Sequence, residues 1–232
     1  MRRKKLVVLT GAGISAESGL RTFRDSGGLW EGFDVMEVAS IDGWHKDRAK
    51  VLDFYNMRRK QALTAAPNPG HFALAKLEEE LDVTIITQNV DNLHEQAGSS
   101  QVIHLHGELF KSRSTIDDNL IYDVSGWELN LGDLCEKGGQ LRPHIVWFGE
   151  MVPLMETAAE QVANADIFMV VGTSLAVYPA ASLIDYALPE IDKYIIDPTI
   201  PIIREHDYVT AIAEPASTGV SKAAKLILER SN

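Results

Sequence analysis

The sequence predicts an α/β protein: a Rossmann-like, doubly wound parallel sheet with a small second domain built from two insertions. Several apolar runs show no alternation with polar residues, as is typical of strands buried on both faces. Helical patterns lie between these runs, which indicates parallel βαβ units. The first run, Leu6 to Leu9, leads directly into the turn Gly11-Ala12-Gly13, which opens a helix.

The predicted strands and helices alternate along the chain without an internal repeat. Strands are expected at residues 6–10, 83–87, 102–105, 145–148, 167–171, 194–196 and 209–212. Helices are expected at residues 71–80, 157–164, 180–187 and 218–229.

Two segments interrupt this alternation and predict the domain organisation. One contains a polar helical stretch at residues 46–63, and the other shows little periodicity and several turn signals. We expect the Rossmann-like domain to comprise residues 1–30, 67–107 and 145–232, and the small domain residues 31–66 and 108–144.

Composition excludes some classes of function. The chain has 232 residues, 45% of them hydrophobic, and a formal net charge of -11. Such acidity argues against a nucleic-acid binder and suits either general solubility or basic partners. The single cysteine, Cys135, excludes an intramolecular disulfide. The apolar run after the basic start is too short for a signal peptide, and no run approaches the roughly 20 residues of a membrane span, so we expect a cytoplasmic protein without membrane contact.

Three predicted strands end in residues suited to a binding site: one in the glycine turn at residues 11–13, and two in polar side chains. Gln88, Asn89 and Asp91 follow one strand, and His106 follows the next. Ligands of open α/β sheets bind at the carboxyl ends of strands, so these side chains should converge on one crevice with the glycine turn. The turn suits a diphosphate, because its backbone N–H groups and the helix N-terminus favour anions. No acidic residue ends a second strand about 20 residues later, so an ordinary dehydrogenase is disfavoured.

Six motifs, taken together, resemble the sirtuins, which are NAD-dependent protein deacylases. They are GAGISAESG at 11–19, TFR at 22–24, TQNVD at 87–91, HLHG at 104–107, FGE at 148–150 and GTSL at 172–175. The motifs occur in the family order and span most of the chain. The resemblance therefore implies NAD as cofactor and acyl-lysine proteins or peptides as substrates.

The resemblance also implies roles for individual residues. In the sirtuin reaction the acyl oxygen attacks C1′ of the nicotinamide ribose and nicotinamide leaves. His106 matches the base that takes a ribose proton, and Asn89 and Asp91 match catalytic residues at the nicotinamide end. The residues that match NAD contacts are Gly11, Ala12, Gly13, Ser15, Glu17, Phe23, Arg24, Trp30, Gln88, Asn89, Val90, Asp91, Gly172, Thr173, Ser174, Asp197 and Ala216. Asp197 stands where the family commonly has Asn, so it can accept from ribose hydroxyls but cannot donate.

Some of these residues also have plainer explanations. Asn89 and Asp91 can cap a strand end, and His106 can be structural. His104 matches no family role, and we expect it to be structural.

The predicted peptide site has two edges between which an extended substrate would add as a strand. Its residues are Val146, Phe148, Gly149, Glu150, Val177 and Tyr178. Tyr55 and Arg58 share a helix face and resemble the pair that marks the class III, desuccinylase-type sirtuins, with Ala39 as the matching small residue. They would bind a dicarboxylic acyl tail. The alternative is a solvated helix face, with Arg58 paired to Glu31 or Asp34.

One region departs from the family. Sirtuins usually carry two Cys pairs that bind zinc, whereas Ser114, Asp117, Cys135 and Gly138 stand at the matching positions. One thiolate cannot close a tetrahedral site, so we expect no metal and a module held by packing. The expected replacement core comprises Leu120, Ile121, Tyr122, Trp127, Leu129 and Leu131.

Two other functions remain open from the sequence. One is a mono-ADP-ribosyltransferase, which breaks the same glycosidic bond but modifies a protein. The other is a catalytically weak NAD-binding module, which the lost cysteines and Asp197 would suit. Neither the preferred acyl group nor the oligomeric state follows from the sequence.

Overall fold

The architecture rests on one six-stranded, wholly parallel sheet. The computed structural model describes residues 2–20, 29–30, 32–202 and 208–231. The strand order is β11 (Val209–Ile212), β10 (Asp192–Ile196), β9 (Ile167–Val171), β1 (Lys5–Thr10), β4 (Asp82–Thr87) and β5 (Val102–His104). Every neighbouring pair is parallel. This is the order of a Rossmann sheet, with the reversal between β1 and β9.

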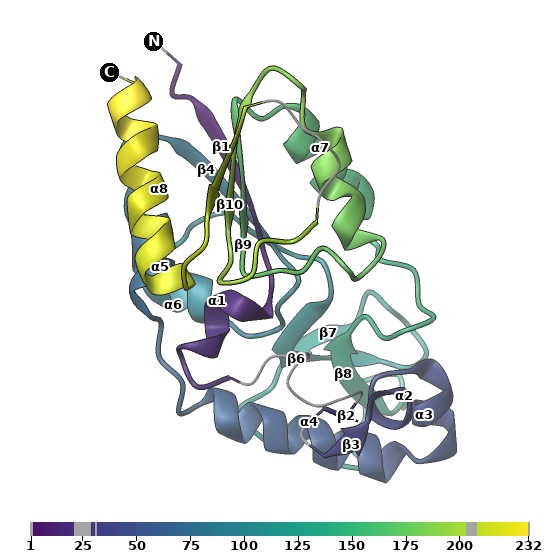
Figure 1. The fold of residues 1–232 in the computed structure, drawn as a ribbon. Coiled ribbons are helices and arrows are strands. Elements are labelled where there is room, and N and C mark those ends of the chain that lie inside the picture. Colours follow the sequence, from purple (N-terminus) through teal and green to yellow (C-terminus); the bar gives the residue numbers. More distant parts are fainter. Residues whose placement is uncertain (1, 21–28, 31, 203–207, 232) are drawn as a thin grey trace.

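Helices cover both faces of the sheet, as the unalternated apolar strands predict (Figure 1). Leu6 and Val8 pack in the core on the side of α5 (Pro69–Leu77) and α8 (Ala216–Ser231). Val7 and Leu9 pack on the opposite side, under α7 (Met155–Ala163) and the 3-10 helix η2 (Ala180–Tyr186). The short helices α1 (Ala12–Ala16) and α6 (Leu93–Ala97) follow β1 and β4 at their carboxyl ends.

The remaining elements form a second region with its own core. Its helices are α2 (Val35–Val38), α3 (Ile41–Lys46) and α4 (Arg48–Ala62). Its strands are β2 (Leu29–Trp30) paired with β3 (Phe33–Asp34), and β6 (Gly107–Ser114) between β7 (Ile121–Asp123) and β8 (Leu141–Ile145). Trp44, Phe54, Tyr55 and Trp147 dominate this core. The exact bounds of the two domains stay a prediction.

One sequence-based expectation about this region is wrong. The strand expected at residues 145–148 instead occupies Leu141–Ile145 and pairs antiparallel with β6. The chain then turns, because the carboxylate of Glu150 accepts the backbone N–H of Trp147 at 2.8 Å. The strand β6 was not among the predicted strands, although its residues alternate in burial. Its inward positions include Ser112 and Ser114, so apolar residues do not mark the alternation.

The expected replacement core is only partly correct. Leu129 is buried, and Leu120, Tyr122 and Trp127 are partly buried. Ile121 and Leu131 are 45% and 56% exposed, because Ile121 lies in the edge strand β7 and Leu131 lies in a turn outside the sheet.

Across the described residues, none of the helices combines the length and the apolar character needed to cross a bilayer.

Candidate active site

The candidate site lies at the carboxyl ends of the parallel strands. The register pairs Thr10 with both Thr87 and Val171, and Thr87 with His104. The residues that follow these strand ends therefore lie along one edge of the sheet. The strand order reverses between β1 and β9, which is where ligands bind in such sheets.

Three glycines let two strand-end turns pack against each other at this point. A Cβ on Gly11 would lie 2.6 Å from the Cβ of Thr173, and one on Gly13 would lie 2.6 Å from the Cα of Gly172. Gly172 itself has a φ of +62°. The N–H groups of Gly11 and Gly13 donate to the carbonyls of Val171 and Gly172 at 3.0 and 2.8 Å. The glycines therefore allow the two backbones to approach closely, as the turn predicts. The N–H groups of Gly13 and Ile14, at the start of α1, already donate to the carbonyls of Gly172 and Gly11, so these two are not open to a diphosphate.

Ser15, Asn89 and Asp91 form a buried polar cluster next to the glycine turn. The Ser15 hydroxyl donates to Asp91 at 3.0 Å, and the Asn89 amide donates to Ser15 Oγ and to the Gly11 carbonyl, each at 3.1 Å. Burial raises the pKa of Asp91, against the hydrogen bonds from the Leu93 N–H and Ser15 and the charges of His104 and Arg58. The cluster joins the ends of β1 and β4 and orients an amide and a carboxyl within one interior site.

His106 is held in a form suited to a general base. Its Nδ1 lies 3.0 Å from the carbonyl oxygen of Gln88, which can only accept, so Nδ1 carries the proton. Nε2 therefore keeps its lone pair. Burial lowers the pKa of His106, against the hydrogen bond to Gln88. The Gln88 amide in turn donates to Thr173 Oγ1 at 3.1 Å, which ties β4 to the turn after β9.

His104 has a different environment from His106. Its Nε2 lies 2.7 Å from Glu95 Oε1 and its Nδ1 lies 3.3 Å from the Asn89 carbonyl. Burial lowers its pKa, but the hydrogen bond and charge of Glu95 outweigh burial and raise the pKa overall. This pairing agrees with a structural His104.

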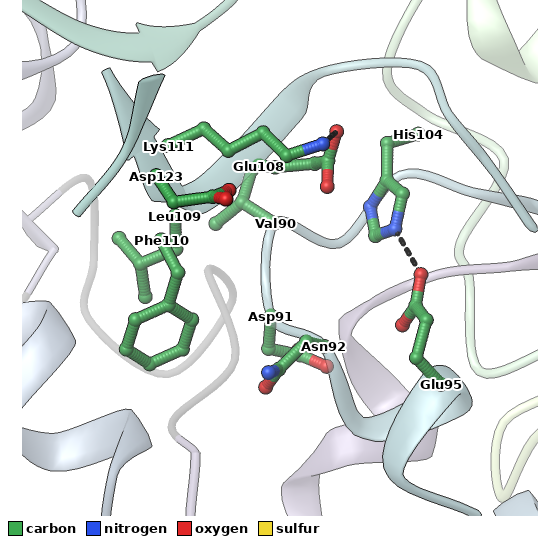
Figure 2. Close-up of a pocket in the computed structure, with 10 residues that line it drawn as sticks. All are labelled: Val90, Asp91, Asn92, Glu95, His104, Glu108, Leu109, Phe110, Lys111 and Asp123. Atoms are coloured by element: carbon green, nitrogen blue, oxygen red, sulfur yellow. Dashed lines mark hydrogen bonds and ion pairs between the residues drawn. The ribbon is translucent and has the colours of Figure 1, made fainter. Parts of the chain in front are cut away.

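A cavity of about 230 Å³ lies beside this histidine. Figure 2 shows the His104–Glu95 pair on one side of it and Glu108, Lys111 and Asp123 on the other.

Two of the residues expected to contact the adenosine and ribose of NAD form hydrogen bonds with the loop after β10 and with the start of α8. Glu17 accepts from the backbone N–H and the hydroxyl of Ser217 at 3.1 and 2.7 Å, next to the buried Ala216. The buried Asp197 accepts from the N–H of Thr199 at 2.8 Å. Phe23 and Arg24 lie outside the described residues, and only the backbone of Trp30, in β2, is described.

Tyr55 and Arg58 lie in the interior on one face of α4. Their exposed fractions are 1% and 7%, so the alternative of a solvated helix face is wrong. Asp34, one of its two suggested partners, caps α2 by accepting from the N–H of Met36 at 2.8 Å, and Glu31 lies outside the described residues. The charge of Arg58 lowers the pKa of both the Tyr55 hydroxyl and Asp91, although burial raises each pKa overall. Arg58 therefore lies within charge range of both the aromatic core and the Ser15–Asn89–Asp91 cluster.

The two expected peptide edges differ in their backbone bonding. In residues 146–150, the N–H groups of Val146 and Phe148 donate to the carbonyls of His106 and Ala39, each at 2.9 Å. The Glu150 carboxylate is also occupied, by Arg142 at 2.7 and 3.0 Å and by Arg113 at 3.3 Å. At the other edge, Tyr178 is 73% exposed and Val177 partly exposed. Among the described residues, no backbone hydrogen bond is recorded from the N–H groups of residues 176–178, so this edge offers more donors to an added strand.

Sequence reasoning missed two residues next to this site. The indole N–H of Trp147 donates to the Tyr55 hydroxyl at 2.9 Å, and the Arg142 guanidinium lies 3.5 Å from the Trp147 ring centroid. In the sequence, Trp147 was marked as a site residue only by its position between Val146 and Phe148, two residues already assigned to the peptide edge.

The positions that match the family's zinc ligands do not fit the metal. The Cys135 thiol lies 3.3 Å from the Ser114 hydroxyl and accepts the Gly139 N–H at 3.3 Å. Asp117 instead pairs with Lys137 at 2.7 Å. Within the described ranges, no three His, Cys, Asp or Glu side chains gather as a metal site. A hydrogen-bonded thiol and an ion pair thus occupy the place of the metal cross-link.

Comparisons with known proteins agree on one family. The Sir2 family profile matches residues 11–179. An NAD-dependent protein deacylase of Helicobacter pylori strain J99 is 56% identical over 215 residues, covering 92% of this chain and 91% of the relative. One from Bacteroides thetaiotaomicron is 50% identical, covering 97% and 98%. A crystal structure of a Sir2 homologue in complex with NAD aligns with a TM-score of 0.88 at 38% identity, covering 99% of this chain and 91% of that one.

Proposed function

We infer that this chain, which belongs to the Sir2 family and is an NAD-dependent protein deacylase, removes dicarboxylic acyl groups such as succinyl and malonyl from lysine, as well as acetyl. The observation that carries the acyl preference is the burial of Arg58 beside Tyr55 on one face of α4. A carboxylate entering an apolar channel needs a cation and a donor to offset its desolvation. Arg58 supplies the first and Tyr55 the second.

The residues at the switch point fit NAD. The glycine turns allow the strand ends to approach closely, and Ser15, Gln88, Asn89, Asp91 and Thr173 supply polar groups along the crevice. NAD supplies the glycosidic bond to nicotinamide that breaks and the ADP-ribose that accepts the acyl group.

Three residues of the chain would orient the cofactor and accept the proton. Asn89 and Asp91, held together through Ser15, would orient the nicotinamide end. His106 would take a proton at Nε2, because Nδ1 is already committed to the Gln88 carbonyl. Burial keeps its pKa low, so the imidazole is neutral and ready to accept a proton at physiological pH.

The acyl-lysine peptide would lie as an added strand against residues 176–178. The backbone would supply most of the affinity, so the sequence requirement around the acyl-lysine should be loose.

The test is a panel of otherwise identical peptides carrying acetyl-, malonyl-, succinyl- and longer acyl-lysine, assayed with NAD by mass spectrometry. We expect O-acyl-ADP-ribose and nicotinamide as products, with the highest kcat/KM for the dicarboxylic acyl groups. Transfer of ADP-ribose to protein would instead indicate an ADP-ribosyltransferase. NAD binding without nicotinamide release would indicate a binding module.

A further inference from the structure

The hydrogen bond between Trp147 and Tyr55 has only one possible direction. An indole N–H can only donate, so the Tyr55 oxygen accepts it at 2.9 Å. The phenolic hydrogen must then point away from the indole, because two hydrogens cannot share that contact. Among the described residues, no acceptor is recorded for this hydrogen, although the Tyr55 side chain is buried. The hydroxyl is thus a donor with a set direction.

The indole of Trp147 is itself held in place by the Glu150–Arg142 pair. The Arg142 guanidinium stacks 3.5 Å from its ring centroid, and the Trp44 ring lies 5.6 Å away. Glu150 fixes this arrangement, because it binds Arg142 through both oxygens at 2.7 and 3.0 Å and also accepts the backbone N–H of Trp147. Such a bidentate, charge-assisted pair is rigid. The indole therefore cannot turn away from Tyr55 without breaking the stack.

We propose that Trp147 is a positioning residue for acyl selectivity, which turns the Tyr55 O–H toward the carboxylate of a succinyl or malonyl group bound beside Arg58. The inference rests on the proposed acyl preference. A donor that is already oriented needs no rearrangement when the carboxylate arrives, so the bond contributes fully to binding. The Glu150–Arg142 pair contributes indirectly, because it holds the indole that orients the Tyr55 hydroxyl. An acetyl group has no carboxylate and gains nothing from this orientation.

The decisive variant is Trp147→Phe, which keeps an aromatic ring under Arg142 but removes the N–H. The matched control is Trp44→Phe, which keeps an aromatic ring beside Trp147 and leaves the indole N–H of Trp147 and its hydrogen bond to Tyr55 in place. Circular dichroism and melting temperature show that each variant is folded. Each is then assayed with succinyl- and acetyl-lysine peptides, alone and combined with Tyr55→Phe.

We expect Trp147→Phe to lower kcat/KM for the succinyl peptide about fivefold, the loss of roughly one neutral hydrogen bond. The change should lie in KM, because the carboxylate is bound equally before and during reaction. Calorimetry with the NAD-free protein should show the same loss of affinity for the succinyl peptide. The acetyl peptide and the Trp44→Phe control should change less than about twofold. In the Tyr55→Phe background, Trp147→Phe should have no further effect.

Two results would overturn the proposal in distinguishable ways. Equal losses for both peptides, or a full Trp147→Phe effect without the Tyr55 hydroxyl, would make Trp147 a packing residue while the acyl preference stands. A wild-type protein that does not favour succinyl over acetyl, and is insensitive to Arg58→Met, would reject the proposed acyl class and the role of Trp147 with it.

Discussion

The Nδ1 of His106 lies 3.0 Å from the carbonyl oxygen of Gln88, and this contact sets the tautomer of the histidine. The nearby His104 shows the contrast, because the carboxylate of Glu95 holds it in addition to the carbonyl of Asn89. Two histidines two residues apart therefore have opposite pKa shifts, and only His106 is kept neutral with a free ring nitrogen.

We predict that His106→Ala binds NAD with nearly unchanged affinity but deacylates about 10²- to 10⁴-fold more slowly, the usual cost of removing a general base. Because burial lowers the pKa of His106, the acid limb of the wild-type kcat/KM profile should lie below pH 6.5, the ordinary histidine value. Steady-state kinetics across pH and calorimetry with NAD measure both. His104→Gln should keep the acid limb. Rapid turnover by His106→Ala, or an acid limb that vanishes in His104→Gln, would assign the base to another group.

The second prediction concerns Arg58. Arg58→Met keeps the bulk of the side chain but removes its charge, and should weaken desuccinylation by about 2 to 4 kcal/mol in transition-state terms, the range for an unpaired buried charge. Deacetylation should change far less. The control is Lys60→Met, which removes a positive charge from an exposed position of the same helix. If kcat/KM fell equally for succinyl and acetyl peptides, Arg58 would be structural.

The third prediction is that folding does not depend on zinc. Cys135 is held by Ser114 and the Gly139 N–H, and Lys137 bridges to Asp117, so no bond of the module requires a metal. Elemental analysis should find no stoichiometric zinc, and EDTA should leave the melting temperature unchanged. Cys135→Ser should shift it by no more than about 4 °C. Stoichiometric zinc together with unfolding on chelation would contradict this account.

The fourth prediction is a loss of stability in acid that originates at His71. Burial lowers the pKa of His71 to about 4, so the folded protein holds this side chain neutral while the unfolded chain protonates it near pH 6.5. The unfolded state therefore binds more protons below pH 6.5, and stability falls as pH drops from 6.5 toward 4.

The contribution of His71 should reach roughly 2 kcal/mol by pH 4.5. Urea unfolding at pH 7.5 and 4.5 measures it, with His71→Gln expected to show a smaller pH difference than wild type. His45→Gln, at an exposed position, is the control. An unchanged pH difference in His71→Gln would assign the acid sensitivity elsewhere.

The parallel sheet was predictable because each of its strands can be recognised from its own residues. Four of the six central strands lie within two residues of their predicted bounds at each end, and the other two, β9 and β11, coincide with their predictions. A strand buried on both faces must be apolar throughout, whatever its neighbours are. The small antiparallel sheet was missed because Ser112 and Ser114 point inward and interrupt the apolar alternation.

The motifs also predicted which polar residues lie together at one edge of the sheet. Gln88, Asn89, Asp91 and His106 follow β4 and β5, and the position of a strand end depends only on the local pattern. The protonation states of these residues could not be predicted from the local sequence, because a pKa depends on groups that are distant in sequence, as Ser15 is from Asp91.

The sequence alone thus determined the fold class, the family and the edge of the sheet where the candidate site lies, because each depends on local patterns of apolar runs, glycines and polar strand ends. Only the tertiary structure decided which glycine N–H groups are occupied, that Arg58 is buried, and that Trp147 donates to Tyr55. These features join residues up to 162 positions apart, as Gly11 is from Thr173, through packing of backbones and rings. No local pattern encodes such contacts, because they arise only when the two regions fold against each other.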